Sequence, residues 1–374
     1  MALDPQPGRR RILRALLLGA LLLFILFRLS ISFFKVSTPS MSDTLLPSDV
    51  IVVYKGTFGY RVGTTRILGW TMPEVGDILV FNYPEGDTVF PAHLNMSYYQ
   101  LGRDHGRGSI ADPNYKILNI APKGFRSLSL GEAEYRAIAD REVFVSRCQG
   151  GPGDTLHLVR GELRLNEELV PFPLQGKLTY HIRFTGSVNH SALSKKLDIP
   201  LDDLQPLDDS TYSIALLPHA AAKLASSRLV ALLEQEQHDP GFSSPYSVLP
   251  YFPHDSAFNW TEDFLGPIII PKRGLTVSLS KQTLPLYRRV IEAYEAKKLL
   301  VRGDRIFINE KETKQYTFEQ DYYWVISDNR HRAMDSRFWG FLPFDHIIGR
   351  TNMVVYNFSA DDGPKWERTF KVIE

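Results

Sequence analysis

The sequence has very little cysteine and almost no net charge. Cys148 is the only cysteine among 374 residues, so no intramolecular disulfide can form and a cysteine-rich zinc site is excluded. The formal net charge is +1, so no overall field favours a nucleic-acid partner. Hydrophobic residues make up 44% and charged residues 23%, as in folded proteins. At this length we expect one large domain with insertions, or two domains.

Long hydrophobic runs are also scarce, and the one candidate lies near the N-terminus. Residues 15–34 are apolar apart from Arg28 and a few small polar residues, and a helix of that length spans about 30 Å of hydrocarbon. Arginines 9, 10, 11 and 14 precede it, so the positive-inside rule places this end in the cytoplasm and the main domain outside. We expect a basic cytoplasmic tail over 1–14 and a single transmembrane anchor over 15–34 in a bacterial plasma membrane.

The alternative for this run is a cleavable signal peptide, because residues 15–27 alone suit its apolar region. No small-x-small cleavage site follows. Phe33, Phe34 and Lys35 follow instead, and they suit a membrane interface, so an uncleaved anchor is the favoured interpretation.

The rest of the chain predicts a mainly β fold with an inserted subdomain. Short β-branched runs at 49–54, 77–82 and 142–146 predict strands, and 158–167 and 300–310 each predict hairpins that turn at Arg-Gly-Glu/Asp and at Asn-Glu. Between them the pattern changes, with helices expected over 218–233 and 284–298, the second capped by Thr283. We therefore expect a β core over 35–170 and 299–374, interrupted by an α+β subdomain over 171–298.

Four sequence segments follow one another in a fixed order. The first is Ser-Thr-Pro-Ser40-Met41 with Thr-Leu45 after it, and the second is Gly-Asp-Ile-Leu-Val-Phe at 76–81. The third is Ser146-Arg147-Cys-Gln-Gly-Gly-Pro-Gly-Asp, and the fourth is Ser-Asp328-Asn-Arg-His-Arg-Ala-Met-Asp-Ser-Arg at 327–337, followed by Trp-Gly. Together they resemble the conserved boxes of type I signal peptidases, the membrane-anchored leader peptidases.

That resemblance implies a serine endopeptidase that removes signal peptides from exported precursor proteins by a Ser–Lys mechanism. Ser40 falls on the nucleophile, a few residues beyond the expected membrane span, and Thr38 on the hydroxyl that stabilises the oxyanion. The peptide-binding positions fall on Val36, Met41, Leu45 and Val145. Positions that support the site fall on Asp328, Asn329, Arg330, Ala333, Asp335 and Arg337, with Asp335 and Arg337 expected to form a structural ion pair. The partners implied are precursor proteins and the lipid bilayer, and no cofactor, metal or nucleic acid is expected.

The sequence departs from the family pattern at the general base. The family lysine precedes an arginine and lies six residues before the proline of Pro-Gly-Asp, and this position is Ser146. A serine cannot act as the base in place of a lysine. The family serine that hydrogen-bonds the lysine falls on Ala333, and the first glycine of the last box is Ser327.

Three hypotheses remain for the activity. The first is a signal-peptide-removing peptidase with an unusual base, for which His331 is the best substitute by proximity, although an exposed surface histidine is favoured there. The second is a catalytically impaired or silent relative that binds precursor tails, or a partner such as a catalytic paralogue, through the same groove. The third is a self-cleaving repressor-type peptidase, which the anchor and the lack of a DNA-binding segment oppose.

Overall fold

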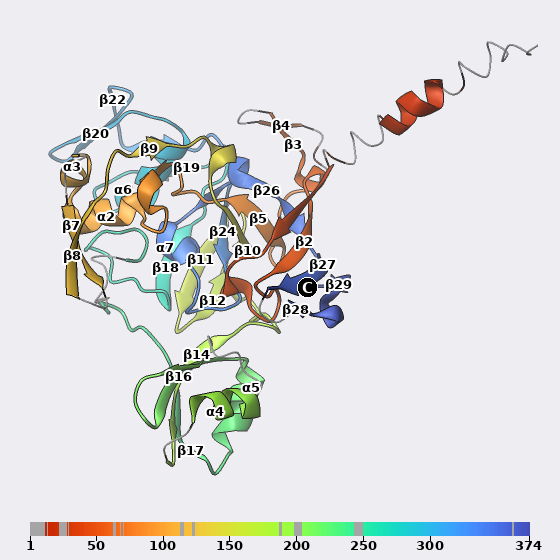
Figure 1. The fold of residues 1–374 in the computed structure, drawn as a ribbon. Coiled ribbons are helices and arrows are strands. Elements are labelled where there is room, and N and C mark those ends of the chain that lie inside the picture. The colour runs from red at the N-terminus through yellow and green to blue at the C-terminus, as the bar shows by residue number, and fades with distance from the viewer. Residues whose placement is uncertain are drawn as a thin grey trace, which may run out of the picture.

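The fold was analysed in a computed structural model of the chain. It describes residues 12, 14–21, 28, 30–62, 65–67, 69, 71–112, 116–121, 124–186, 189–197, 204–242, 250–360 and 363–374. Figure 1 shows a β-rich body, a smaller lobe below it, and an N-terminal segment that leaves the body on one side.

The N-terminal segment differs from its prediction at its C-terminal end. Ile31–Lys35 form strand β1, which pairs antiparallel with β2 (Asp49–Tyr54), so the last residues of the predicted span belong to the sheet. β-Branched and aromatic side chains in both strands favour this pairing. Residues 22–27 and 29 of the predicted anchor lie outside the described residues. Among the residues that are described, no helix is both long and apolar enough to cross a bilayer.

A large antiparallel sheet forms one half of the body and confirms the mainly β fold. Its strand order is β25-β24-β10-β5-β26-β2-β27-β28, with β1 beside β2 and β29 beside β27. The strands not yet bounded are β5 Ile78–Asn82, β10 Val143–Gly150, β24 Tyr322–Ile326, β25 Leu342–Pro343, β26 Ile347–Thr351, β27 Met353–Ser359, β28 Gly363–Pro364 and β29 Lys371–Val372. β5 and β24 are buried along their whole length, which explains their continuous apolar runs.

The other half of the body packs several small sheets and a helix around one hydrophobic core. The four-stranded sheet β13-β12-β11-β18 contributes leucines and isoleucines to this core. Helix α6 (Leu284–Arg289) covers it with Leu284 and Tyr287, and the π turn after α6 adds Ile291. The strands are β11 Thr155–Val159, β12 Glu162–Leu165, β13 Glu168–Leu169 and β18 Phe264–Ile269. Residues 264–291 therefore pack with the body, although they fall within the predicted insert.

The predicted hairpins are present. β11 and β12 turn at Arg160-Gly161, and β20 (Leu299–Arg302) and β21 (Arg305–Ile308) turn at Gly303-Asp304. The remaining strands of the body are β3 Tyr60–Val62, β4 Thr65–Ile67, β6 Thr88–Val89, β7 Lys116–Ala121, β8 Gly124–Ser129, β9 Glu134–Tyr135, β19 Thr276–Ser278, β22 Lys311–Thr313 and β23 Gln315–Thr317. The short helices of the body are α2 Tyr98–His105, α3 Arg107–Ile110 and α7 Ser336–Trp339.

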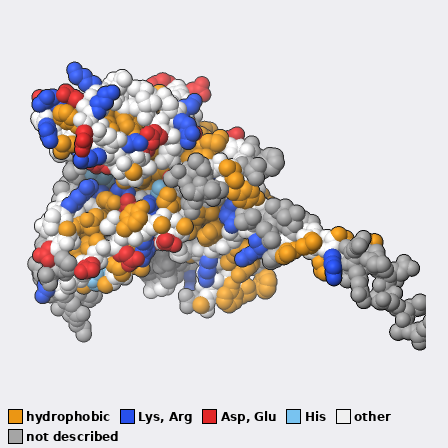
Figure 2. Space-filling view, turned by 90° about the horizontal axis from the view of Figure 1, so that it is seen from above, with side chains coloured by type: hydrophobic (Ala, Val, Ile, Leu, Met, Phe, Trp, Pro, Cys, Tyr) orange, Lys and Arg blue, Asp and Glu red, His pale blue; other side chains and the backbone are white. Residues whose placement is uncertain are grey.

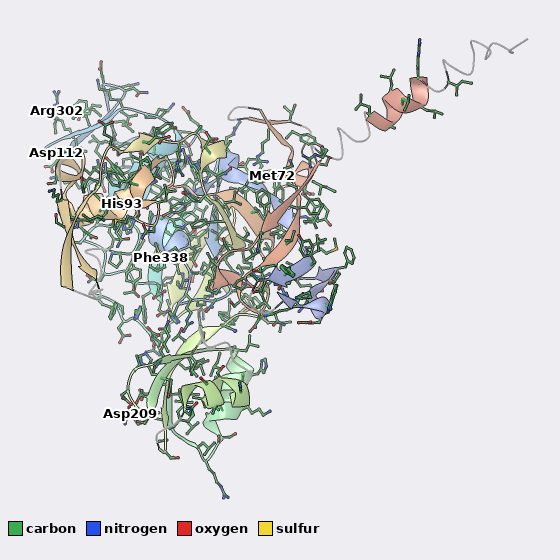
Figure 3. The ribbon with its side chains drawn as sticks, viewed as in Figure 1. Met72, His93, Asp112, Asp209, Arg302 and Phe338 are labelled. Carbon is green, nitrogen blue, oxygen red and sulfur yellow. The ribbon has the colours of Figure 1, made fainter. Side chains whose placement is uncertain are left out.

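A separate lobe is built from residues 178–235. The sheet β15-β16-β14-β17 packs with helices α4 and α5 around its own core, which includes Ile182, Ile214 and Leu193. Its elements are β14 Leu178–Phe184, α4 His190–Leu197, β15 Leu204–Pro206, β16 Thr211–Leu216, α5 Pro218–Ala225 and β17 Val230–Gln235. Asp209 lies in this lobe, far from Phe338 in the body (Figure 3).

Both predicted helices of the insert are shorter than expected. The first, predicted over 218–233, ends at Ala225, because Val230–Gln235 form strand β17 and pair with β14. The second consists of α6 (Leu284–Arg289) followed by one π turn (Val290–Tyr294), and its predicted last residues, 295–298, form the link to β20. Thr283 makes no side-chain cap, and its hydroxyl donates to the carbonyl of Ser278 at 2.9 Å.

Candidate active site

Ser40 lies on a tight turn immediately after β1. Pro39–Met41 form one 3-10 turn, which begins after Thr38 in extended conformation. The turn is anchored by three side chains that are buried in the core beside β2: Val36, Met41 and Leu45. Ser40 itself stays partly exposed. The hydroxyls of Thr38 and Ser40 lie 3.1 Å apart, within hydrogen-bonding distance.

The last sequence box clamps this turn from the other side. The backbone N–H of Asn329 donates to the carbonyl of Ser40 at 2.9 Å, and its side-chain amide donates to the carbonyl of Pro39 at 3.1 Å. The hydroxyl of Thr44 donates to the carboxylate of Asp328. Segments almost 290 residues apart in sequence are thereby joined, which explains why Asp328 and Asn329 are fully buried.

Two buried ion pairs hold the last box in shape. Arg147 donates two hydrogen bonds to Asp328, at 2.8 and 2.7 Å, in the bidentate geometry that suits a guanidinium and a carboxylate. Arg337 makes the corresponding pair with Asp335, at 2.9 Å from both Nε and Nη2. Oδ2 of Asp335, which accepts from Nη2 of Arg337, also accepts from the backbone N–H of Ser327 at 3.0 Å. The predicted structural pair of Asp335 and Arg337 is therefore present. Burial, with Arg337 nearby, lowers the pKa of Arg330 to about 10.

The position of the family lysine holds a pair of serines. Ser146 and Ser327 are 2% and 3% exposed, and their hydroxyl oxygens lie 2.9 Å apart. Ser146 is in β10, whose backbone at this point pairs with Leu79 of β5. Both serines line the same groove as Ser40.

This groove has a volume of about 590 Å³ and a mostly apolar wall. Val36, Met41 and Val145, predicted to bind peptide, line it, and so does Ala333. Leu45 does not, because it is completely buried in the core below the turn. The ionisable side chains among the described lining residues are Lys35, Glu142 and Arg332.

His331 does not fill the role of a base. Its side chain is 3% exposed, so the prediction of an exposed surface histidine is wrong. Nε2 lies 3.3 Å from the carboxylate of Asp263, and Nδ1 accepts from the backbone N–H of Thr179 at 3.3 Å. His331 is not among the residues that line the groove. Its partners lie far from it in the sequence, so the residues around His331 could not predict these contacts.

One further residue that supports the site was not predicted from the sequence. Lys177 is buried, its ammonium lies 3.2 Å from Asp43 in the Ser40 turn, and its backbone bonds to Asp328 and Arg330. It does not line the groove, so it supports the turn from behind. Cys148 is fully buried, and burial raises the pKa of its thiol to about 12, so it is no alternative nucleophile.

Comparison with known proteins agrees with this arrangement. A family model described as "Signal peptidase, peptidase S26" matches residues 9–211 and 292–356. The chain belongs to this signal peptidase family. Signal peptidase I of Helicobacter pylori strain J99 is 22% identical over 234 residues, which cover 58% of this chain and 69% of the relative. Signal peptidase I of Buchnera aphidicola subsp. Baizongia pistaciae is 22% identical over 341 residues, covering 88% and 71%.

A short stretch is closer to another member of the signal peptidase family. Signal peptidase I of Aquifex aeolicus is 40% identical over 43 residues, which are 12% of this chain and 17% of the relative. The family expected from the four boxes is thereby confirmed, and a signal-peptidase-like function is supported.

Proposed function

We propose that this chain binds the cleavage region of signal-peptide-bearing precursors in the Ser40 groove and holds it without efficient cleavage. The observation that carries the proposal is the buried pair of Ser146 and Ser327 hydroxyls at the position of the family base. A serine hydroxyl attacks a peptide bond only when a base takes its proton, and neither hydroxyl can do so at neutral pH.

The other groups around the groove do not replace the base. An arginine such as Arg332 stays protonated, and the carboxylate of Glu142 lies 3.1 Å from the guanidinium of Arg136. Lys35 is exposed at the end of β1, whereas the family mechanism uses a buried lysine. A neutral amine close to Ser40, which the family mechanism requires, is not supplied by any of these side chains.

The backbone around the groove suits an extended peptide. Among the described strands, β1 pairs with β2 alone. Val143–Ser146 of β10 pair with β5, whereas β24 pairs with β10 only from Arg147 onward. Both segments line the groove, so each offers a strand edge to a bound peptide. A peptide that adds between such edges gains main-chain hydrogen bonds, and apolar pockets then select alternate side chains.

The setting we propose is a bacterial plasma membrane, with an anchor in the segment that precedes β1, the N-terminus in the cytoplasm and the groove outside. Ser40 follows directly after β1, so the groove would lie close to the bilayer from which a precursor emerges. A catalytic paralogue is a fitting partner, because it would supply the cleavage that this chain lacks.

A second candidate function is slow cleavage by Ser40 itself. The observation that favours it is the retained contact between Ser40 and Thr38, at 3.1 Å, on an accessible turn. Cleavage that disappears in Ser40→Ala would establish this candidate in place of the first.

Peptide binding can be tested with two matched variants of the full chain in detergent. Val143 lines the groove and is 38% exposed, whereas Val159 on β11 is 36% exposed and lies outside it. With a fluorescent peptide that carries a small-x-small site, Val143→Arg should raise the Kd at least about tenfold, and Val159→Arg should leave it unchanged. An unchanged Kd in Val143→Arg, or no binding by the wild type, would contradict the proposal.

A further inference from the structure

A second cavity of about 590 Å³ lies in the other half of the body. It is bounded by α2 and α3 on one side, by α6 on another, and by the loop at 252–255. None of its lining residues lines the Ser40 groove. The cavity has no role in the proposed function.

Cationic side chains predominate in this cavity. Three acidic residues line it, Glu85, Asp255 and Glu292. Five basic residues are among its described lining residues: Arg103, Arg107, Lys281, Arg288 and Arg289. Two of them pair with carboxylates outside the lining, Arg289 with Asp87 at 3.3 Å and Lys281 with Asp304 at 2.6 Å, so the excess of positive charge lies with the arginines on α2, α3 and α6. Charge complementarity favours an anionic ligand.

Two of the guanidinium groups are held in place before any ligand arrives. Arg289 donates to the carbonyl of Pro84 at 2.9 Å and to the hydroxyl of Tyr294 at 2.9 Å, and it stacks on the ring of Tyr99 at 4.2 Å. Arg103 lies 3.6 Å from the buried carboxylate of Glu85. Groups that are already ordered lose less conformational entropy when they bind a ligand.

Arg107 and Arg288 lie at the rim and are freer to turn toward a ligand, whereas Lys281 pairs with Asp304 at 2.6 Å. Arg288 is 47% exposed and contacts only Glu292 among the ion pairs of the described residues, at 3.6 Å. Arg107 is exposed, forms no ion pair with any described residue, and lies 6.0 Å from the ring centroid of Tyr99. Both present several N–H donors in the geometry that matches carboxylate or phosphate oxygens.

The cavity also has an aromatic wall. Tyr99, Phe252 and Trp339 line it, and the Trp339 ring is almost entirely buried. Flat apolar walls with a few convergent charged groups are typical of small-molecule sites, and the volume falls within their usual range. A folded macromolecule would not enter a recess of this size.

From this combination we propose that the cavity binds a small organic anion, in which a carboxylate or phosphate group is joined to a flat apolar body. The anionic group contacts Arg107, Arg288 and Arg103, and the apolar body packs against Phe252 and Trp339. The proposal does not depend on peptide binding in the Ser40 groove, because the two cavities have separate linings.

Calorimetric titration of the full chain in detergent tests this site with three probes. Phenyl phosphate and benzoate carry the two anionic groups on the same ring, and benzyl alcohol is their neutral counterpart. We expect at least one anionic probe to bind with a Kd below about 1 mM and the alcohol to bind at least tenfold more weakly. Which anion binds more tightly identifies the head group. No binding by either anion, or equal binding of the alcohol, would overturn the proposal.

Two arginine variants and one matched control localise the binding. Arg107→Gln and Arg288→Gln should each weaken the anionic probe about tenfold, because each removes a charge-assisted contact at an exposed position that the fold does not need. Arg302 is equally exposed, near the edge of the body in Figure 3, and does not line the cavity, so Arg302→Gln should leave the Kd unchanged. If Arg302→Gln weakens binding as much as the other two, the site is refuted and the attraction is a general surface effect.

Discussion

The hydroxyls of Ser146 and Ser327 form a hydrogen bond of 2.9 Å in the buried wall beside the Ser40 turn. Each hydroxyl is hydrogen-bonded to the other, so neither buried oxygen needs a charged partner. A buried lysine would have to be partly neutral at this depth, whereas the serine pair carries no ionisation cost. The absence of the base therefore leaves a stable groove.

Restoring the family residues should create cleavage. In Ser146→Lys with Ala333→Ser, burial would lower the pKa of the new ammonium, so its neutral form could take the Ser40 proton. We expect cleavage of a precursor with a small-x-small site to rise at least about 100-fold, measured by the gel shift of the product. Ser40→Ala in the same background should abolish it. A double variant that folds, binds peptide and stays inert would show that more than the base has changed.

Asp328 should be one of the least replaceable residues of the body. Asp328→Asn leaves Arg147 buried without a full counter-charge and weakens the clamp on the Ser40 turn. We expect the free energy of unfolding to fall by about 3–5 kcal/mol, measured by urea denaturation. The control is Glu312→Gln, since Glu312 forms an exposed pair with Arg305 at 3.7 Å and should change stability by less than about 1 kcal/mol. Equal effects would contradict a structural role for the clamp.

Stability should depend on pH through His238. The carboxylates of Glu236 and Glu262 raise the pKa of His238 to about 10, although burial opposes them. Because the folded pKa lies above the unfolded value of about 6.5, this stabilisation is complete below pH 6.5 and is lost as pH rises toward 10. The neighbouring Tyr251, Asp263, His331 and Arg337 share this cluster.

The measurement is the melting temperature of wild type and His238→Gln between pH 6 and pH 10. Across this range the free energy of unfolding should fall by on the order of 2 kcal/mol more in the wild type than in the variant. Parallel curves would show that the imidazolium contributes nothing to the fold. At low pH the acidic partners act in the opposite sense, because the pKa values of Glu236 and Asp263 are lowered.

Gly340 should not tolerate even one methyl group. Its φ is +88°, and a Cβ there would lie 2.6 Å from the ring of Phe252. We expect Gly340→Ala to cost about 2 kcal/mol or more of unfolding free energy. Gly108, in α3, has open space around it, so Gly108→Ala should be neutral or stabilising by up to about 1 kcal/mol. Equal denaturation midpoints for the two variants would contradict this.

Local patterns in the sequence predicted what depends on local structure. The strand over 49–54 and the hairpins at Arg-Gly-Glu/Asp follow from β-branched runs and turn residues, and the structure has them. The ordered boxes located the Ser40 turn because motif spacing is a local property. The helix predicted over 218–233 was wrong at its end, since pairing with β14 outweighs the helical preference of leucine-rich residues.

Contacts between residues far apart in the sequence could not be predicted from local patterns. Nothing near Lys177 indicates that its ammonium reaches Asp43, or that its backbone bridges to the last box. His331 was predicted to be a surface residue, whereas its side chain is buried and lies 3.3 Å from Asp263, 68 residues earlier. The pairing of Ser146 with Ser327 likewise needs the fold, because 181 residues separate them.

The lobe shown below the body in Figure 1 begins and ends at one place. The backbone N–H of Glu236, just after β17, donates to the carbonyl of Thr179 in β14 at 2.8 Å, and the core of the lobe is its own. A short turn between Thr179 and Glu236 could therefore replace the lobe, because loop-closure entropy depends only weakly on the length of the loop. None of the described residues that line the Ser40 groove belongs to the lobe, so a chain shortened at this joint would keep the whole lining of the groove.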